Sequence, residues 1–222
     1  MVDKNIRQHR IRQDNTRLQR ELQSMLGTLR IKNAQLQDSM EKLRQMATTD
    51  HLTGLANRRQ FAEILERCYS EAVRYGFDLT CCMCDLDNYK QLNDCLGHQV
   101  GDEVLVTAAE VIRQSLRNTD AAGRYGGDEF VLLLPHTSVA ESLEVCQRIA
   151  GQLQEAVRPL CGKTLPVTLS VGLASLSTDR PPTADALVAL ADKALYMAKD
   201  RGKNQIIAFS QARREPVPAG NG

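Results

Sequence analysis

The sequence predicts an α/β sandwich, in which helices cover a mainly antiparallel sheet, preceded by a long coiled-coil helix. Leucines recur every seven residues in the first 47 residues, which indicates a coiled coil. From Thr48 onward short apolar runs alternate with helical patterns, which indicates a sheet with helices packed on it. A Gly126-Gly127 turn between two apolar runs adds a hairpin. We therefore expect a coiled coil at 1–47, a globular domain at 48–209 and a disordered tail at 210–222.

The coiled coil is predicted from two apolar rows spaced as a seam requires. These rows are Leu22, Leu29, Leu36 and Leu43, and Ile11, Leu18, Met25 and Met46. Asn15 interrupts the leucine row, and Lys32 and Ser39 interrupt the second; polar seam positions fix register or weaken association. One amphipathic helix packed on its own domain is the alternative. More than six turns of seam exceed what a small domain covers, which favours self-association.

The first elements of the globular part are a helix, a strand and a second helix. The helix at Arg58–Tyr75 follows Asn57, a residue suited to an N-cap. Leu79–Leu86 is mainly apolar, which is typical of a buried strand. Val100–Leu116 is predicted to be a helix whose buried face carries Val104, Ala108, Val111 and Ile112.

The next elements form the predicted hairpin and the helix after it. Ala121–Tyr125 and Glu129–Leu134 are expected to be strands joined by the glycine turn. Ser138–Val157 is expected to be helical.

The domain ends with a strand, a helix and a short strand. Leu165–Ala174 is the predicted strand, and Thr183–Arg201 is a helix that Gly202 terminates. A short strand near Gln205–Ala208 closes the domain. Two prolines and two glycines after Ser210 predict the disordered tail.

Composition excludes several classes of protein. The net charge is +1, from 28 basic and 27 acidic residues, so no overall field selects nucleic acid or an anionic membrane. We expect no membrane span, because no apolar run approaches about 18 residues, and the N-terminus lacks a signal peptide's apolar stretch.

Seven cysteines without paired spacing predict reduced thiols and a cytoplasmic location. Cys81, Cys82 and Cys84 resemble a metal cluster, but neighbours in a strand point to opposite faces.

Two pairs of carboxylates stand beside apolar strands. Asp85 and Asp87 end the first strand, where a charge is costly unless it is paired. Asp128 and Glu129 follow the glycine turn. Acids at a turn are usually solvated, so each pair alone is a weak signal. If the two strands are neighbours, Asp85, Asp128 and Glu129 form one cluster of the hard oxygen ligands that Mg²⁺ prefers.

The string Arg124–Phe130, read Arg-Tyr-Gly-Gly-Asp-Glu-Phe, resembles the signature of GGDEF domains, the diguanylate cyclases. Further stretches resemble the family's other motifs in the same order, and together they cover about residues 50 to 208. They are Asp50–Arg59, Asp85–Lys90 with Asn93-Asp94 and Gly97–Asp102, Leu169–Gly172, and Ala191–Lys199 with Gly202–Asn204. The resemblance implies a fold like that of nucleotide cyclases and polymerase palm domains.

The resemblance also assigns a metal site. It implies that Asp85, Asp128, Glu129 and the main-chain carbonyl of Leu86 bind Mg²⁺, or Mn²⁺ in its place. Glu129, with Asp128 beside it, matches the acids held to be catalytic, and Glu129 would activate the attacking hydroxyl. The metal would polarise the α-phosphate and lower the pKa of the ribose 3′-hydroxyl.

The family's GTP-binding positions fall on further residues of this chain. Asn93 and Asp102 match the guanine-reading positions, since a carboxylate accepts from guanine N1–H and N2–H. The implied phosphate and turn contacts are Lys90, Lys199, Lys203, Gly126 and Gly127. Basic residues at a helix C-terminus are the ordinary alternative for Lys199 and Lys203. His98 lies in the same segment, where a capping or surface role is as well supported.

The implied reaction joins two GTP molecules into cyclic di-GMP with loss of two pyrophosphates. Two domains must face each other across a two-fold axis, so the coil would serve as the tether of a homodimer or higher oligomer. A regulatory protein on the coil is the other partner that the sequence suggests. The rival hypotheses are an inactive GGDEF domain that serves as a nucleotide receptor, and a coiled-coil adaptor. Nothing in the chain resembles the companion phosphodiesterase domain.

A second nucleotide site is implied by Arg117 and Asp120. They match the family's RxxD inhibitory site at its usual distance before the glycine turn, and Arg148 falls where a third contributor often lies. An arginine suits the O6/N7 edge of guanine, which would let the product inhibit the enzyme. The resemblance thereby places the chain in bacterial second-messenger signalling, the control of biofilm included.

Overall fold

The computed structural model describes residues 48–161 and 166–212, together with residues 23–37 apart from 24, 28 and 34. The chain divides into two compact units, Met1–Ala47 and Thr48–Gly222. In the first unit the described residues are helical, and the apolar side chains of Met25, Leu29 and Leu36 are exposed by more than half. The other predicted seam positions lie outside the described residues: Ile11, Asn15, Leu18, Leu22, Ser39, Leu43 and Met46.

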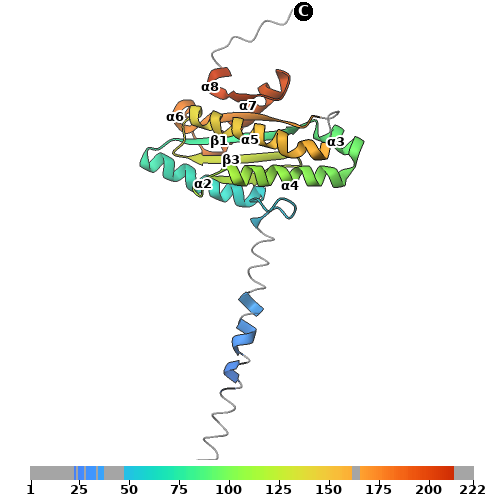
Figure 1. Ribbon diagram of the computed structural model, residues 1–222. Helices are drawn as coiled ribbons and strands as arrows, with labels where there is room; N and C mark the ends of the chain where they lie inside the picture. Colours follow the sequence, from blue (N-terminus) through green and yellow to red (C-terminus); the bar gives the residue numbers. More distant parts are fainter. Residues whose placement is uncertain are drawn as a thin grey trace, which may run out of the picture. The chain divides into compact units, whose positions relative to one another are not determined.

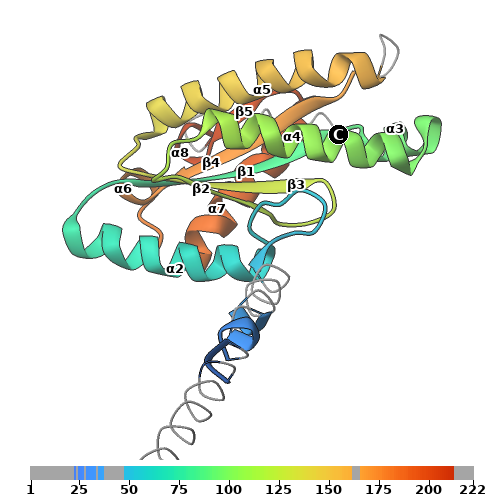
Figure 2. The same ribbon diagram turned by 60° about the horizontal axis from the view of Figure 1, so that its bottom comes forward.

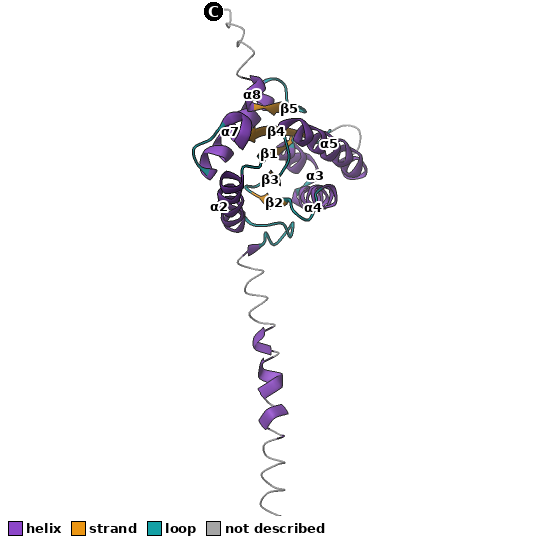
Figure 3. Cartoon of the chain, turned by 90° about the vertical axis from the view of Figure 1, so that its left-hand side faces the viewer, coloured by secondary structure: helices purple, strands orange, loops and turns teal. Residues whose placement is uncertain are grey.

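The second unit is built on a sheet flanked by helices (Figure 1). Its described strands follow the order β2-β3-β1-β4-β5 (Figure 3). The strands are β1 at Leu79–Asp87, β2 at Ala121–Arg124, β3 at Glu129–Pro135, β4 at Thr168–Ser175 and β5 at Ile206–Ala208. Pairing is antiparallel except between β4 and β5. The mainly antiparallel sheet expected from the sequence is therefore confirmed, and β1 lies at its centre.

Helices cover both faces of this sheet. They are α2 at Arg58–Tyr75, α3 at Tyr89–Leu96, α4 at His98–Ser115, α5 at Val139–Cys161, α6 at Leu176–Asp179, α7 at Ala184–Asp200 and α8 at Phe209–Ala212. Viewed along the sheet, α2 and α7 lie on one side and α4 and α5 on the other (Figure 3). α4 and α5 run side by side across their face (Figure 2).

Alternation along β1 divides the core into two layers. Cys82, Cys84 and Leu86 pack with α4 and α5, whereas Cys81 and Met83 pack with α2 and α7. Cys81 therefore faces away from Cys82 and Cys84, so these three thiols do not converge on one ion. Burial raises the pKa of Cys81 to about 12, which keeps the thiol protonated and apolar in character.

Predicted and observed elements agree closely at the first helix. α2 has the predicted bounds, and the Asn57 side chain accepts a hydrogen bond from the Gln60 amide at 2.9 Å, as an N-cap does. α4 begins two residues earlier than expected, at His98, and α5 continues to Cys161 through Pro159 in its last turn. β4 begins at Thr168, because Pro166 and Val167 lie outside the ladder.

Three short helices were not predicted. α3 has two turns with one buried side chain, Leu92, so it carries almost no periodic signal. α6 and α8 have four residues each. α8 also corrects the predicted tail, because residues 210–212 are helical rather than disordered, and residues 213–222 lie outside the described ones.

Candidate active site

The carboxylates at the C-terminal end of β1 and at the glycine turn before β3 lie at the same end of these two strands. β1 and β3 are neighbours, and Asp85 is the register partner of Glu129. The Leu86 amide donates a hydrogen bond to the Asp128 carbonyl at 3.2 Å, which places Asp128 beside the same strand end. β1 and β3 are therefore neighbours, as the predicted cluster of Asp85, Asp128 and Glu129 requires. The cluster itself stays a prediction.

A lysine from α7 is part of the same cluster. Lys199 Nζ lies 2.7 Å from Asp85 Oδ2. Burial raises the pKa of Asp85 to about 6; the hydrogen bond from Lys199 opposes this rise, and the charges of Asp128 and Glu129 add to it. Burial alone would lower the pKa of Lys199, but its bond to Asp85 and the three acidic charges outweigh burial and raise it. The Lys199 ammonium is therefore held in its charged form, and it pairs with the Asp85 carboxylate, whose ionised form burial disfavours.

The glycine turn brings the Glu129 side chain close to its own backbone. The amides of Tyr125 and Gly126 both donate to the Glu129 carbonyl, at 2.8 and 3.4 Å. A Cβ on Gly126 would contact the Glu129 carboxylate, so a side chain there would displace the Glu129 side chain from its position. A Cβ on Gly127 would meet nothing within 4 Å. A glycine at position 126 therefore leaves room for the Glu129 carboxylate as it lies in this structure.

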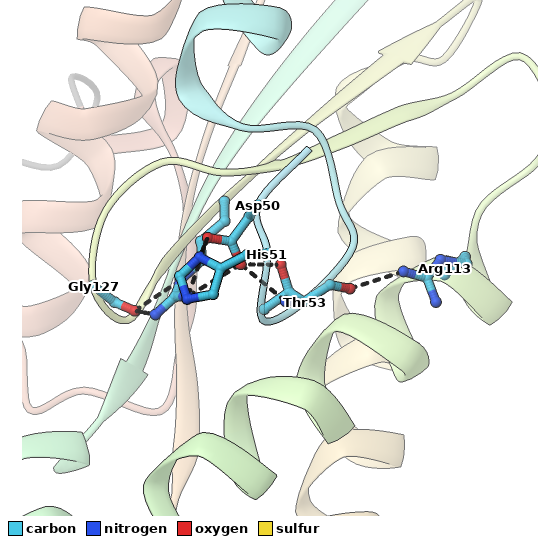
Figure 4. A network of polar contacts seen from close by, with 6 residues as sticks. Asp50, His51, Thr53, Arg113 and Gly127 are labelled. Carbon is cyan, nitrogen blue, oxygen red and sulfur yellow. Dashed lines mark hydrogen bonds and ion pairs between the residues drawn. The ribbon is translucent and has the colours of Figure 1, made fainter. Parts of the chain in front are cut away.

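The turn is also held from outside, by a chain of bonds that Figure 4 shows. Arg124 donates to the Gly127 carbonyl through Nε at 3.1 Å and a terminal nitrogen at 2.7 Å, and to both oxygens of Asp50 at 3.1 and 3.2 Å. Asp50 also accepts from the amide and hydroxyl of Thr53, whose carbonyl accepts from Arg113. Burial alone would raise the pKa of Asp50, but these bonds lower it below its usual value. Asp50 and Arg124 belong to the motifs read from the sequence, yet this joint role was not predicted.

The two predicted base-reading residues come from neighbouring helices. Asn93 lies on α3 and Asp102, which is exposed, on the first turns of α4. Asn93 Oδ1 is buried without a hydrogen-bond partner, and a Cβ on Gly101 would collide with it. A pocket of about 370 Å³ is lined by Leu52, Asp102, Glu103, Val106, Thr107 and Leu160, so Asp102 borders it and Asn93 does not. The unpaired buried acceptor of Asn93 is suited to a ligand that donates a hydrogen bond.

The predicted phosphate contacts are not all drawn together. Lys199 binds Asp85, and Lys203 Nζ donates to Asn88 Oδ1 at 2.9 Å, so both lysines reach the C-terminal end of β1. Lys90 is exposed on α3. His98 is the exposed first residue of α4, where the cap, Gly97, makes no side-chain bond.

A second buried carboxylate at this end of β1 was noticed in the sequence but given no role. Asp87 is 2% exposed and accepts hydrogen bonds from Thr168, Ser170 and the Asn204 amide. Its partners lie 81 to 117 residues further along the chain, so no local pattern could have revealed them.

The predicted inhibitory residues lie around the loop between α4 and β2. Asp120 accepts a hydrogen bond from the Arg117 main-chain amide at 2.9 Å, which leaves the exposed Arg117 side chain outside this bond. Arg148, on α5, donates to the Ser115 carbonyl at 2.9 Å. The structure thus brings Arg148 to the end of the helix that leads into Arg117.

The oxygen atoms at this end of β1 and β3 are of the kind that binds a hard divalent cation. Asp85, Asp128, Glu129 and the Leu86 carbonyl offer carboxylate and carbonyl oxygens alone, the ligands that Mg²⁺ takes. Within the described residues no three acidic, histidine or cysteine side chains are closed around a common point. Mg²⁺ usually takes one or two carboxylates and completes its shell with water and substrate phosphate, so an open arrangement is compatible with it.

Residues 47–205 match the family described as "Diguanylate cyclase, GGDEF domain". The chain belongs to this family. Diguanylate cyclase A of Treponema denticola is 36% identical to it over 184 residues, which are 82% of this chain and 47% of that protein. The chain spans about a quarter to a half of the length of the curated relatives first matched.

Two solved GGDEF structures resemble the chain closely. The coiled coil and GGDEF domain of DgcB from Caulobacter crescentus, in complex with c-di-GMP, superposes with a TM-score of 0.75 at 28% identity, covering 84% of this chain and 98% of that one. Diguanylate cyclase SiaD, in complex with its activator SiaC from Pseudomonas aeruginosa, has a TM-score of 0.67 at 32% identity, covering 92% and 79%. The helix-flanked five-stranded sheet is the fold of this family.

Proposed function

We propose that this GGDEF chain condenses two GTP molecules into cyclic di-GMP. The observation that carries the proposal is the pairing of Asp85 with Glu129 across β1 and β3, with Lys199 bound to Asp85. Acids and a cation at one end of the central strands support triphosphate chemistry there. In each of two steps a ribose 3′-oxygen attacks an α-phosphorus, and the bond to pyrophosphate breaks as the new P–O bond forms.

Asp85, Asp128, Glu129 and the Leu86 carbonyl would hold Mg²⁺, or Mn²⁺ in its place. When bound, the metal supplies charge neutralisation at the phosphates and acidifies the attacking hydroxyl. Glu129 is the residue we assign to accept the proton of that hydroxyl, because it lies on the rigid end of β3 rather than on a loop tip. Lys199 and Lys203 would bind the phosphates, with Lys90 on α3 as a third contributor.

Guanine is the base that the acceptors of Asn93 and Asp102 suit best. Asn93 Oδ1 lacks a donor, and Asp102 adds a carboxylate among apolar walls from Leu52, Val106 and Leu160. Guanine offers N1–H and N2–H donors, whereas adenine offers neither at those positions. A site that leaves its own buried acceptor unpaired rejects the wrong base strongly.

The reaction needs two copies of the domain, and we infer that residues 1–47 bring them together. Met25, Leu29 and Leu36 are exposed apolar side chains at predicted seam positions, which supports association with a second helix. The DgcB structure contains a coiled coil together with its GGDEF domain. SiaD is described with an activator protein, which supports the proposal that a regulatory partner acts on this chain too.

Product inhibition and a cytoplasmic location complete the proposal. DgcB is described in complex with c-di-GMP, which supports product binding at Arg117, Asp120 and Arg148.

All seven cysteines are free thiols, as a reducing compartment would keep them. Among the described helices, none is both long and apolar enough to cross a membrane.

Product analysis tests the proposal directly. Purified full-length chain incubated with GTP and Mg²⁺ should yield cyclic di-GMP and two pyrophosphates for each product molecule. Glu129→Gln, a nearly isosteric change, should keep the fold and lose at least about 100-fold in rate. GTP binding without turnover by the wild type would instead favour the nucleotide-receptor hypothesis, and absence of GTP binding would favour the coiled-coil adaptor.

A further inference from the structure

Asp87 is a buried charge outside the proposed metal site, and it is fully engaged in hydrogen bonds. Its Oδ2 accepts from Thr168 Oγ1 at 2.7 Å and from the Asn204 amide at 3.0 Å. Ser170 Oγ lies 2.8 and 3.0 Å from its two oxygens. Burying a carboxylate is costly unless such donors surround it. The carboxylate therefore ties the end of β1 to β4 and to a turn 117 residues further along the chain.

The turn that Asp87 holds has an unfavourable backbone. Gly202, Lys203 and Asn204 have φ values of 107°, 64° and 48°, all in the region that favours glycine. Lys and Asn adopt such angles where surrounding bonds hold them there. The Asn204 amide is held by Asp87 and also lies 3.1 Å from Ser170 Oγ.

The conformation of this turn decides where Lys203 points. Its main-chain amide caps α7 through the Ala198 carbonyl at 3.0 Å, and its Nζ reaches Asn88, the residue after Asp87. Four residues earlier Lys199 reaches Asp85. The two ammonium groups therefore meet the same strand end, one from the helix and one from the turn.

We propose that Asp87 is a positioning residue for triphosphate binding, which acts by holding the Gly202–Asn204 turn so that Lys203 faces the substrate's phosphates. This inference rests on the proposed function, in which Lys203 binds phosphate. An amide could not replace the carboxylate. Asn offers one acceptor oxygen, and its NH₂ group would face hydroxyl or amide donors where Asp87 now accepts.

Asp87→Asn is the test, read as the ratio of two affinities. A non-hydrolysable GTP analogue and GMP would be titrated calorimetrically with Mg²⁺ into the full-length protein. The variant should bind the GTP analogue about tenfold more weakly, as expected for the loss of one charge-assisted hydrogen bond. GMP affinity should change less than about twofold, because the proposed base-reading residues, Asn93 and Asp102, are unchanged. In the Asp87→Asn background, Lys203→Ala should cost little more, whereas in the wild type it should cost about tenfold.

The chain offers a matched control at the other end of the same two strands. Asp78 precedes β1 and accepts from Ser175 Oγ at 2.9 Å and from the amides of Leu79 and Ser177. Asp78→Asn removes a comparable anchor and should leave the GTP-to-GMP ratio unchanged. If Asp87→Asn does not fold, Ser170→Ala keeps the charge, removes one donor, and should shift the ratio in the same direction.

Three results are decisive. The first is an unchanged GTP-to-GMP affinity ratio in Asp87→Asn, or in Ser170→Ala where that variant is used, while the wild type binds GTP. This result overturns the role of Asp87 and leaves the proposed function standing. An equal loss of both ligands overturns it as well, because a merely structural role would weaken the base and phosphate sites together. A wild type that does not bind the GTP analogue contradicts the proposed function itself.

Discussion

The pKa of Asp85 is set by effects that oppose one another. Burial and two neighbouring acids disfavour its charge, while the Lys199 ammonium at 2.7 Å favours it, and the balance puts its pKa at about 6. In the nucleotide-free protein, Lys199 thus partly satisfies a group that the proposed metal would also claim. Under the proposed function, a metal bound at Asp85 would replace Lys199 there, and Lys199 would become available to bind phosphate.

The raised pKa predicts how proton and metal compete. Mg²⁺ binds the ionised carboxylate, and with a pKa of about 6 the ionised fraction falls roughly fourfold between pH 7.5 and 5.5. Mg²⁺ affinity of the nucleotide-free protein should therefore fall about fourfold over that range. Calorimetric titration at pH 7.5, 6.5 and 5.5 measures it. Asp85→Asn, as the control, should bind Mg²⁺ weakly at every pH; equal wild-type affinity at both ends would contradict the shifted pKa.

The same shift has a consequence for stability. Because the folded protein holds this proton more tightly than the unfolded chain does, the metal-free free energy of unfolding should fall as pH rises from about 4 to about 6. The cluster thus costs stability at neutral pH, as proposed functional acids commonly do.

At the scale of residues, the sequence predicted that Asp85, Asp128 and Glu129 stand on neighbouring strands, but not the bonds that hold these strands and their turn in place. Asp85, Asp128 and Glu129 stand next to apolar strands, and a hairpin with one further pairing is enough to unite them. Arg124 and Asp50 lie 74 residues apart, and Asp87 and Asn204 lie 117 apart. Such bonds depend on the finished fold, whereas each of these residues taken alone resembles an ordinary surface or turn residue.

Among the elements, the strands were the most predictable. Continuous apolar runs identified β1 and β3, and the glycine turn identified β2 and its pairing with β3. α3 was missed because a two-turn helix with one buried leucine has no usable period. That omission mattered, because α3 places Asn93 against Gly101 at the start of α4. The contact between Asn93 and Gly101 therefore comes from tertiary packing between two helices rather than from a local motif.

The turn between β2 and β3 also depends on a segment outside the hairpin. Residues 49–56 run beside β2, where Ala56 bridges Gly123 and its carbonyl accepts from the Arg124 amide at 2.9 Å. Arg124 then joins Asp50 to Gly127. The first residues of the domain are in this way bonded to the turn that carries Asp128 and Glu129.

The loop between α4 and β2 is where product inhibition can be tested. Arg117→Ala removes an exposed side chain and keeps the main-chain amide that binds Asp120, so the loop should keep its shape. Wild-type synthesis should slow as cyclic di-GMP accumulates, whereas the variant should continue linearly, with initial rates within about twofold of each other. Progress curves with and without added product measure this.

The control for that experiment lies elsewhere on α5. Arg158→Ala removes an exposed arginine that faces Glu155 at 3.7 Å and should be inhibited like the wild type. Equal product sensitivity in Arg117→Ala and the wild type would remove Arg117 from the inhibitory site.

The chain divides into two compact units, Met1–Ala47 and Thr48–Gly222, to which we assign different tasks. The second, from Thr48, contains every residue assigned to the metal, the base and the phosphates. The first contributes exposed apolar side chains with no counterpart in the described part of a single chain. The heptad spacing predicted this division, but sequence periodicity alone does not specify how many helices associate.

The last prediction separates tethering from catalysis. Deleting residues 1–46 should leave a folded domain that binds GTP, because Asp85, Asn93, Asp102 and Glu129 all remain. Its specific activity at nanomolar enzyme should fall by about tenfold or more and rise steeply with protein concentration, since two half-sites must now meet from solution instead of at an effective concentration of about millimolar.

In the full chain, replacing Leu29 and Leu36 by serine should have the same effect, whereas Ile31→Ser, equally exposed but off the predicted seam, should not. Rates measured against enzyme concentration compare all four proteins. If the truncated domain is as active at nanomolar concentration as the full chain, residues 1–47 do not dimerise it, and their exposed apolar face would instead be a docking site for another protein.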